Sequence, residues 1–176
     1  MSARTGLFLL ITLFIANPGS AQPSTFPANW AGNWKGELRW YSAKKTAPQN
    51  VMMELRIRKE DTSSHYSWQL VYGADNRDNR PYSLIPIDSA SGHWAVDEHN
   101  GIVIDQFWVG DKFCSAFKVQ QTTIVNNYWL EGDKMVVEFC SFSAKPVSTT
   151  GAGTDESPLV ESYRVTGFQR AILTRQ

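Results

Sequence analysis

Two short segments of this chain concentrate residue types used in acid–base catalysis and metal binding. Asp97-Glu98-His99-Asn100-Gly101 places two carboxylates beside an imidazole, a combination that could transfer protons or ligate a metal. Asp75–Arg80 offers oxygen ligands for Ca²⁺, but it contains two Arg residues and lacks the Gly and final Glu of the known calcium loop. Asp, Asn and Gly are also the usual turn residues. We therefore interpret the first segment as a hairpin turn and the second as a solvated loop.

The usual motifs of nucleophilic and metal catalysis do not occur. No Ser has Gly-x-Ser-x-Gly surroundings, and no His-rich zinc spacing is present. We predict no catalytic residue, no metal site and no cofactor. An enzyme built on this chain would use a buried Asp105 with Glu138 or His93, and nothing in the spacing demands that arrangement.

Alternating apolar and polar residues recur along most of the chain, which is typical of half-buried strands. Strands are predicted over residues 34–40, 51–58, 65–72, 80–88, 92–98, 101–109, 112–120, 122–130, 134–143 and 160–174. Asn100-Gly101 matches a two-residue type I′ turn, and Gly110-Asp111 and Gly132-Asp133 are similar short turns. The two long connections are the polar loop 75–80 and the Gly-, Ser- and Thr-rich stretch 148–158.

Successive hairpins with almost no helix predict an all-β fold: a single antiparallel up-and-down β-barrel of about 8–10 strands, which leaves no unpaired sheet edge. A two-sheet sandwich is the alternative. It normally needs crossover connections, and short hairpins leave little chain for them.

Polar residues interrupt the apolar faces of the later strands. Gln106, Ser115 and Asn126 each share a face with hydrophobic residues, and a mostly apolar concavity with a few polar groups is how small-molecule pockets are built. Burying an unpaired amide costs about 1–3 kcal/mol, so these groups need partners in a ligand, in water or in one another. The predicted ligand-binding residues are Trp40, Met53, Leu55, Tyr66, Trp68, Gln106, Ser115, Asn126 and Tyr128.

The register of the strand over residues 101–109 decides which polar group faces inward. In the expected register Gln106 points inward together with Trp108. A slip by one residue would instead turn Val103, Asp105 and Phe107 inward. A buried Asp would be the stronger functional candidate, because a buried carboxylate demands a partner.

Cys114 and Cys140 are the only cysteines in the chain. A pair in an oxidising compartment usually forms a disulfide. Here the two lie on strands separated by another strand, about 9.6 Å apart, whereas a disulfide needs Cα atoms within about 7 Å. Either the bridge is absent or the simple strand order fails at this point.

The N-terminal residues resemble a cleaved secretory signal. Arg4 precedes an apolar run over residues 6–16, and Gly19-Ser20-Ala21 supplies the small residues that a signal peptidase needs. The run is too short to span a bilayer, which takes about 20 apolar residues. We expect cleavage after Ala21, a single domain over residues 22–176, and a periplasmic or secreted protein without stable membrane insertion. Equal numbers of basic and acidic residues, 17 of each, argue against a nucleic-acid partner.

The chain resembles the calycin superfamily, which includes the lipocalins and the fatty-acid-binding proteins. The resemblance depends on Asn29-Trp30-Ala31-Gly32-Asn33-Trp34, which is similar to the lipocalin Gly-x-Trp opening, and on basic residues in the last strand. It implies that Arg170 or Arg175 packs over Trp34 and closes one end of the barrel by a cation–π contact. Two features depart from the family: no long lipocalin helix and no helical lid are visible. A related haem-binding barrel uses a His on a late strand, which this chain lacks.

Three functions are compatible with these features. The favoured one is an exported lipocalin-like barrel that binds a small, largely apolar or amphipathic ligand in its interior without transforming it. The second is a protein-binding module, such as a periplasmic inhibitor or an assembly factor, with loops working on a filled barrel. Outward-facing Phe107, Trp129 and Phe142 would suit such a surface if they formed one patch. The third is the barrel enzyme with buried carboxylates.

Overall fold

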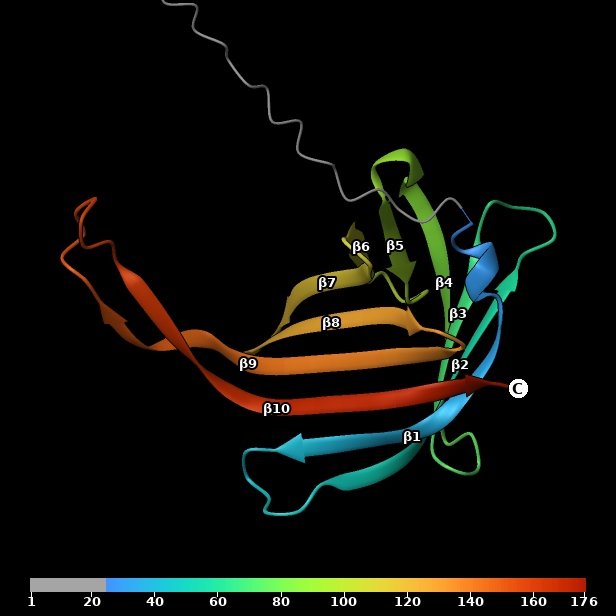
Figure 1. Ribbon diagram of the computed structural model, residues 1–176, viewed down its shortest axis with the longest axis horizontal. Coiled ribbons are helices and arrows are strands. Elements are labelled where there is room, and N and C mark those ends of the chain that lie inside the picture. Colours follow the sequence, from blue (N-terminus) through green and yellow to red (C-terminus); the bar gives the residue numbers. More distant parts are fainter. Residues whose placement is uncertain (1–24) are drawn as a thin grey trace, which may run out of the picture.

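The structure, a computed structural model, describes residues 25–176, so the predicted signal segment over residues 1–21 lies outside the described residues. The described chain is almost entirely β-structure (Figure 1). Its elements are η1 (Ala28–Trp30), β1 (Gly32–Ser42), β2 (Gln49–Lys59), β3 (Tyr66–Tyr72), β4 (Asp78–Asp88), η2 (Ser89–Ser91), β5 (His93–Asp97), β6 (Val103–Val109), β7 (Lys112–Val119), β8 (Thr122–Glu131), β9 (Lys134–Thr150) and β10 (Val160–Arg175). No helix in this part of the chain is long and apolar enough to cross a membrane.

The ten strands form a closed antiparallel barrel in which each strand pairs with its neighbours in the sequence. The barrel closes where β1 pairs with β10, from Trp34 opposite Arg175 to Ser42 opposite Gly167. Gly36 permits this seam, because a Cβ at that position would collide with the backbone oxygen of Ile172. The prediction of a single antiparallel up-and-down barrel is confirmed, and the sandwich alternative is wrong.

Three of the predicted turns can be compared with the structure. Gly110-Asp111 and Gly132-Asp133 are two-residue hairpin turns, and both glycines have positive φ, 65° and 62°. The prediction for Asn100-Gly101 is wrong, because β5 ends at Asp97 and β6 begins at Val103. The backbone reverses over the intervening five residues, with His99 at φ 60° in the left-handed region.

The registers of β6, β7 and β9 resolve two open points. Gln106 is 2% exposed inside the barrel and the Asp105 side chain lies outside it, so the expected register is confirmed. Cys114 pairs with Asn127 of β8 and Cys140 pairs with Val125 of the same strand, so β8 separates the two cysteines. Both are free thiols. The disulfide is therefore absent and the simple strand order holds.

Aromatic rings fill one end of the barrel interior. Phe26 and Trp30, which precede the first strand, insert among rings from the strands, and the Trp34 indole donates a hydrogen bond to the Trp30 carbonyl at 2.8 Å. The rings that contact Phe26 or Trp30, mostly edge-to-face, are Trp68, Trp94, Trp108 and Phe113. We call this half of the interior, sealed by Phe26 and Trp30, the closed half, and the rest the open half.

The β9–β10 hairpin extends well beyond the barrel wall (Figure 1). The last residue of β9 that pairs with β8 is Ser143, and the first residue of β10 that pairs with β1 is Gly167. Between them the two strands pair only with each other, through a β-ribbon with three register shifts. The prediction of a loop over residues 148–158 is wrong at its start, because β9 continues to Thr150.

Candidate functional site

The open half of the barrel contains a cavity of about 180 Å³ that opens to solvent. Its floor is formed by Trp68 and Tyr128, whose rings meet edge-to-face at 5.2 Å above the aromatic cluster of the closed half. Eight strands, all but β1 and β2, contribute to its wall. The other lining residues are Leu70, Tyr72, Arg80, Tyr82, Val96, Glu98, Ile104, Gln106, Phe117, Ile124, Asn126, Phe139, Ser141 and Gln169.

One buried polar atom of the cavity wall has no hydrogen-bond partner among the described residues. The side-chain oxygen Oε1 of Gln106 is buried and accepts no hydrogen bond from any described residue. The neighbouring polar pair is satisfied, because Ser115 Oγ donates to Asn126 Oδ1 at 2.5 Å. A buried acceptor without a donor costs about 1–3 kcal/mol, so Gln106 is an unsatisfied group beside the cavity.

The two charged groups of the cavity wall differ in whether an opposite charge neutralises them. Arg80 is held by Asp78 through two hydrogen bonds of 2.8 and 2.7 Å, and its guanidinium lies 5.0 Å from the centre of the Tyr72 ring. This pairing lowers the pKa of Asp78, chiefly through the hydrogen bond from Arg80. Glu98 accepts a hydrogen bond from the Asn100 amide at 3.3 Å but has no cation within 4 Å among the described residues. The wall therefore presents one uncompensated carboxylate.

Three tyrosines bring hydroxyl groups to the cavity. Burial raises the pKa of Tyr72 to about 12. The pKa values of Tyr82 and Tyr128 are also raised, in both cases mainly by burial, and Glu98 adds to the effect on Tyr82. All three are thus neutral donors and acceptors near pH 7.

The residues predicted to bind a ligand occupy four different kinds of position in the structure. Trp68, Gln106, Asn126 and Tyr128 line the cavity, whereas Ser115 lies behind Asn126. Met53, Leu55 and Tyr66 belong to the packed core and do not line it, and Trp40 is 41% exposed opposite Gln169. The ligand-binding roles of all nine residues remain predictions.

The barrel end near Trp34 carries the contacts that the calycin resemblance implies. The Arg175 guanidinium lies 4.4 Å from the centre of a Trp34 ring and donates to the carbonyls of Ala31 and Asn29 at 2.7 and 2.8 Å. Arg170 points outward, 3.4 Å from Glu138. Arg175, and not Arg170, is thus the residue that covers Trp34.

The structure does not assemble the carboxylates on which an enzyme would depend. Asp105 and Glu138 both lie on the outer surface, the first 2.8 Å from His93 and the second beside Arg170. Among the described residues, no group of three or more His, Cys, Asp or Glu side chains could hold a metal ion. The buried carboxylates on which the third alternative depends are therefore not formed by Asp105 and Glu138.

An outer-surface cluster brings a serine, a histidine and two carboxylates together. Ser83 Oγ lies 3.1 Å from His99 Nε2 and 3.0 Å from Glu60 Oε1. The nearest oxygen of Asp97 is 3.8 Å from His99 Nδ1, too far for a hydrogen bond that would orient the ring. Ser83 is buried and its hydroxyl faces Glu60, so the cluster connects strands and loops and lacks an activated nucleophile.

Six polar residues of the cavity wall are not among the predicted ligand-binding residues: Tyr72, Arg80, Tyr82, Glu98, Ser141 and Gln169. Of these, Arg80 falls at the end of the predicted solvated loop and Glu98 in the predicted turn. The available signal was alternation: Tyr82 and Arg80 continue the inward row of Leu84, and Glu98 continues that of Val96.

No protein-family model matches this sequence, and no curated protein matches it. Among solved structures, the chain is similar to the crystal structure of a protein of unknown function from the DUF3598 family of Nostoc punctiforme, with a TM-score of 0.61 and 14% sequence identity. The similarity covers 92% of this chain and 53% of that chain, so this chain spans about half the length of the Nostoc protein. At this identity the likeness concerns the fold of the ten-stranded barrel alone.

Proposed function

We propose that this chain is an exported, calycin-like barrel that binds a small amphipathic molecule in its open half without transforming it. The observation that carries the proposal is the buried Gln106 Oε1, an acceptor without a protein donor in the wall of a cavity. A ligand with a hydroxyl or amine group would satisfy it. Export is inferred from the N-terminal sequence, and the calycin relationship from the Gly-x-Trp opening and the cation on Trp34.

The size of the cavity limits the ligand. A volume of about 180 Å³ is below the 300–1,000 Å³ of typical pockets and close to that of an engineered cavity that binds benzene. A sterol or a porphyrin exceeds it, and a long chain would have to extend through the opening. We therefore expect a ligand whose enclosed part is about the size of one aromatic ring with a short substituent.

Charge narrows the choice further. Asp78 compensates Arg80, whereas Glu98 is left without a cation. A ligand carboxylate would face the Glu98 carboxylate, and like charges in a partly buried site repel. Neutral donors and amines are thus favoured over acids.

Three probes of matched size test this proposal: benzylamine, benzyl alcohol and benzoate. We expect the amine and the alcohol to bind with millimolar dissociation constants, a reasonable affinity for about eight heavy atoms, and benzoate to bind at least tenfold more weakly. Titrations followed by NMR chemical shifts would give both the affinities and the location. Shifts should centre on Gln106, Tyr128 and Asn126.

Two variants separate the hydrogen bond from the charge. Gln106→Leu should weaken the alcohol and the amine alike, whereas Glu98→Gln should reduce the preference for the amine over benzoate. Gln69→Leu, on the outer face of β3, is the matched control and should change nothing. Absence of saturable binding by any probe, or equal binding to the wild type and the Gln106 variant, would refute the proposal.

A further inference from the structure

The β9–β10 ribbon beyond the barrel, residues 145–165, lacks a packing partner on its own molecule. We call this segment the arm. It projects away from the barrel (Figure 1). Its side chains are almost all exposed, among them Val147, Tyr163, Val165 and Leu159, the last at 65%. A lone two-stranded ribbon is marginally stable in water, and its free edges are templates for pairing, so an arm with exposed apolar side chains favours a partner surface.

A groove on the outer barrel wall lies at the base of the arm. It has a volume of about 590 Å³ and is formed by outward side chains of β1 and β10. Its apolar residues are Tyr41, Phe168 and Ile172, and the rings of Tyr41 and Phe168 are 6.3 Å apart. The groove also contains two cations, Arg39 and Arg170, and one carboxylate, Glu37.

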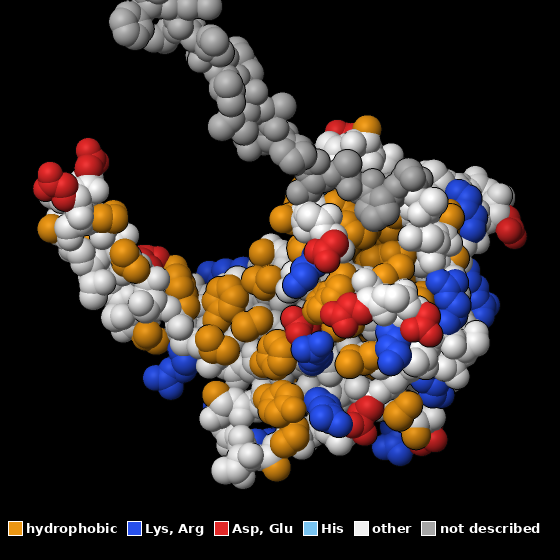
Figure 2. Space-filling view, in the orientation of Figure 1, with side chains coloured by type: hydrophobic (Ala, Val, Ile, Leu, Met, Phe, Trp, Pro, Cys, Tyr) orange, Lys and Arg blue, Asp and Glu red, His pale blue; other side chains and the backbone are white. Residues whose placement is uncertain are grey.

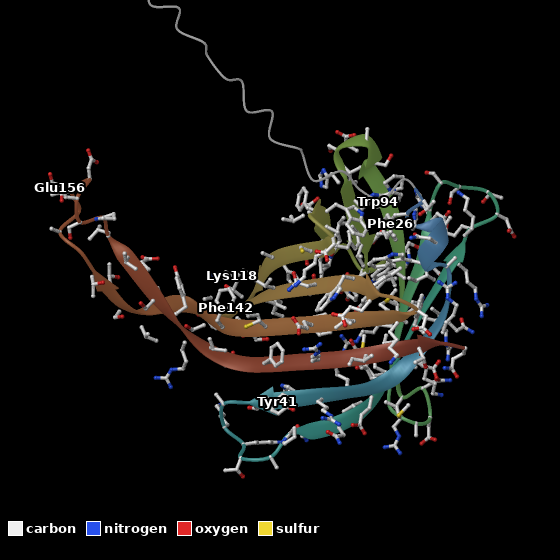
Figure 3. All side chains as sticks on the ribbon, viewed as in Figure 1. Phe26, Tyr41, Trp94, Lys118, Phe142 and Glu156 are labelled. Atoms are coloured by element: carbon white, nitrogen blue, oxygen red, sulfur yellow. The ribbon has the colours of Figure 1, made fainter. Side chains whose placement is uncertain are left out.

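The groove and the arm form one continuous surface. Phe142 lies where the arm leaves the barrel, pairs with Val165 and contacts the Tyr163 ring at 6.1 Å. Figure 3 places Phe142 and Tyr41 along the same side of the barrel, and Figure 2 shows hydrophobic side chains gathered around that region. The groove, which would bind the arm of a partner, is thus adjacent to the molecule's own arm.

The tip of the arm is acidic, whereas the cations outnumber the carboxylate in the groove. The arm tip bears Asp155 and Glu156, both exposed and without a cation within 4 Å among the described residues, and Figure 2 shows this acidic tip. In the groove, Arg39 and Arg170 make only long, exposed contacts to Glu37 and Glu138, 3.5 and 3.4 Å. Such contacts contribute little, so both guanidinium groups remain able to pair with an incoming carboxylate.

We propose that the groove binds the arm of a second copy of this chain, in a two-fold symmetric dimer in which each arm lies on the other molecule. A two-fold interface requires a self-complementary surface, because both molecules contribute the same patch. Here each molecule contributes one arm and one groove. The dimensions agree: the arm from Glu156 to Val160 spans at most roughly 13 Å, as does the groove from Phe168 to Ile172, at about 3.3 Å per residue. Leu159 and Val160 would cover the apolar residues of the groove, and Asp155 and Glu156 beside them would reach the arginines. The inference is independent of what the cavity binds.

Charge exchange between two variants tests the dimer. One variant carries Arg39→Glu with Arg170→Glu, and the other carries Asp155→Arg with Glu156→Arg. Sedimentation velocity and light scattering should show the wild type as a dimer that dissociates in the micromolar range, as expected of an interface of modest size. Each variant alone should weaken self-association at least tenfold, because it places like charges together. An equimolar mixture should recover a dimer, since Glu in one groove then meets Arg on the other tip.

The control carries Asp111→Arg with Asp133→Arg, two exposed turn residues away from the arm, and should dimerise like the wild type. All substituted residues are exposed, and circular dichroism would verify that each variant is folded. A wild type that stays monomeric up to about 100 µM, variants that remain dimeric, or a mixture that remains monomeric would each overturn the proposal.

Discussion

The two halves of the barrel interior are built from the same alternating strands and have opposite character. In the closed half, large rings fill the space, and backbone carbonyls near the end accept from Trp34 and Arg175. In the open half, the same inward rows continue as Tyr, Gln, Asn, Arg and Glu around a cavity of about 180 Å³. We therefore expect the two halves to differ in their roles, since a packed core leaves no room for a ligand and a polar cavity contributes less to folding.

The largest expected effect comes from breaking the closed half. Trp34→Ala removes a ring that is 1% exposed, its hydrogen bond to Trp30 and the surface on which Arg175 rests. Truncation of a buried aromatic typically costs about 3–5 kcal/mol, and we expect that loss in the free energy of unfolding, measured with urea. Probe binding in the open half should change less than twofold where the variant is folded.

Trp40→Ala provides the matched control on the same strand and the same face. Trp40 lies at the other end of β1 and is 41% exposed, so its removal should cost less than about 1 kcal/mol. Equal destabilisation by the two substitutions would contradict the division into a packed and an unpacked half.

The pH dependence of the free energy of unfolding tests whether Tyr72 in the open half is shielded from solvent. Burial raises the pKa of Tyr72 to about 12, above the value of about 10 in an unfolded chain. Above pH 10 the unfolded chain therefore releases this proton more readily than the folded one, which favours unfolding. The contribution of Tyr72 to the free energy of unfolding is complete below pH 10 and is lost as the pH rises through 12. Because Tyr72 lies near the cavity opening, we expect this contribution to be up to about 2 kcal/mol.

Tyr72→Phe isolates this effect. Urea unfolding of the variant should depend less on pH between about 10 and 12 than that of the wild type. Tyr41→Phe on the exposed outer wall is the control and should behave like the wild type. An identical pH dependence for Tyr72→Phe and the wild type would show that Tyr72 is not protected from solvent.

Alternation along the strands predicts well whether a side chain points into or out of the barrel. It predicts poorly how far along the barrel axis that side chain lies. Alternation placed Gln106 and Asn126 inside correctly, and the glycines at positions 110 and 132 located two turns. It also assigned Met53 and Leu55 to a ligand wall, because inward-facing residues look alike in sequence whether they belong to the core or to the cavity. Depth depends on strand tilt and on which end is sealed, and neither is a local property.

Two further features escaped prediction for physical reasons. The plug formed by Phe26 and Trp30 includes one 3₁₀ turn, which is too short to show any periodicity. The arm has a Gly-, Ser- and Thr-rich composition typical of loops, and pairing between its two strands, which sequence composition does not report, makes it a ribbon.

The smallest expected effect is a gain in the free energy of unfolding rather than a loss. Gln106→Leu removes the one fully buried cavity-wall acceptor among the described residues that lacks a donor, and it replaces an amide with an apolar group of similar size. Since an unsatisfied buried acceptor costs about 1–3 kcal/mol, the variant should be more stable than the wild type by about 1 kcal/mol, measured by urea unfolding in the absence of ligand. Asn126→Leu is the contrasting case, because it leaves Ser115 without its acceptor and should be destabilising. A gain in stability at Gln106 together with a loss of alcohol and amine binding would indicate that this amide is kept for recognition, as stabilising substitutions at binding sites commonly reduce function. A clear loss of stability would instead assign Gln106 to the structural core and move the boundary between the two halves toward the opening.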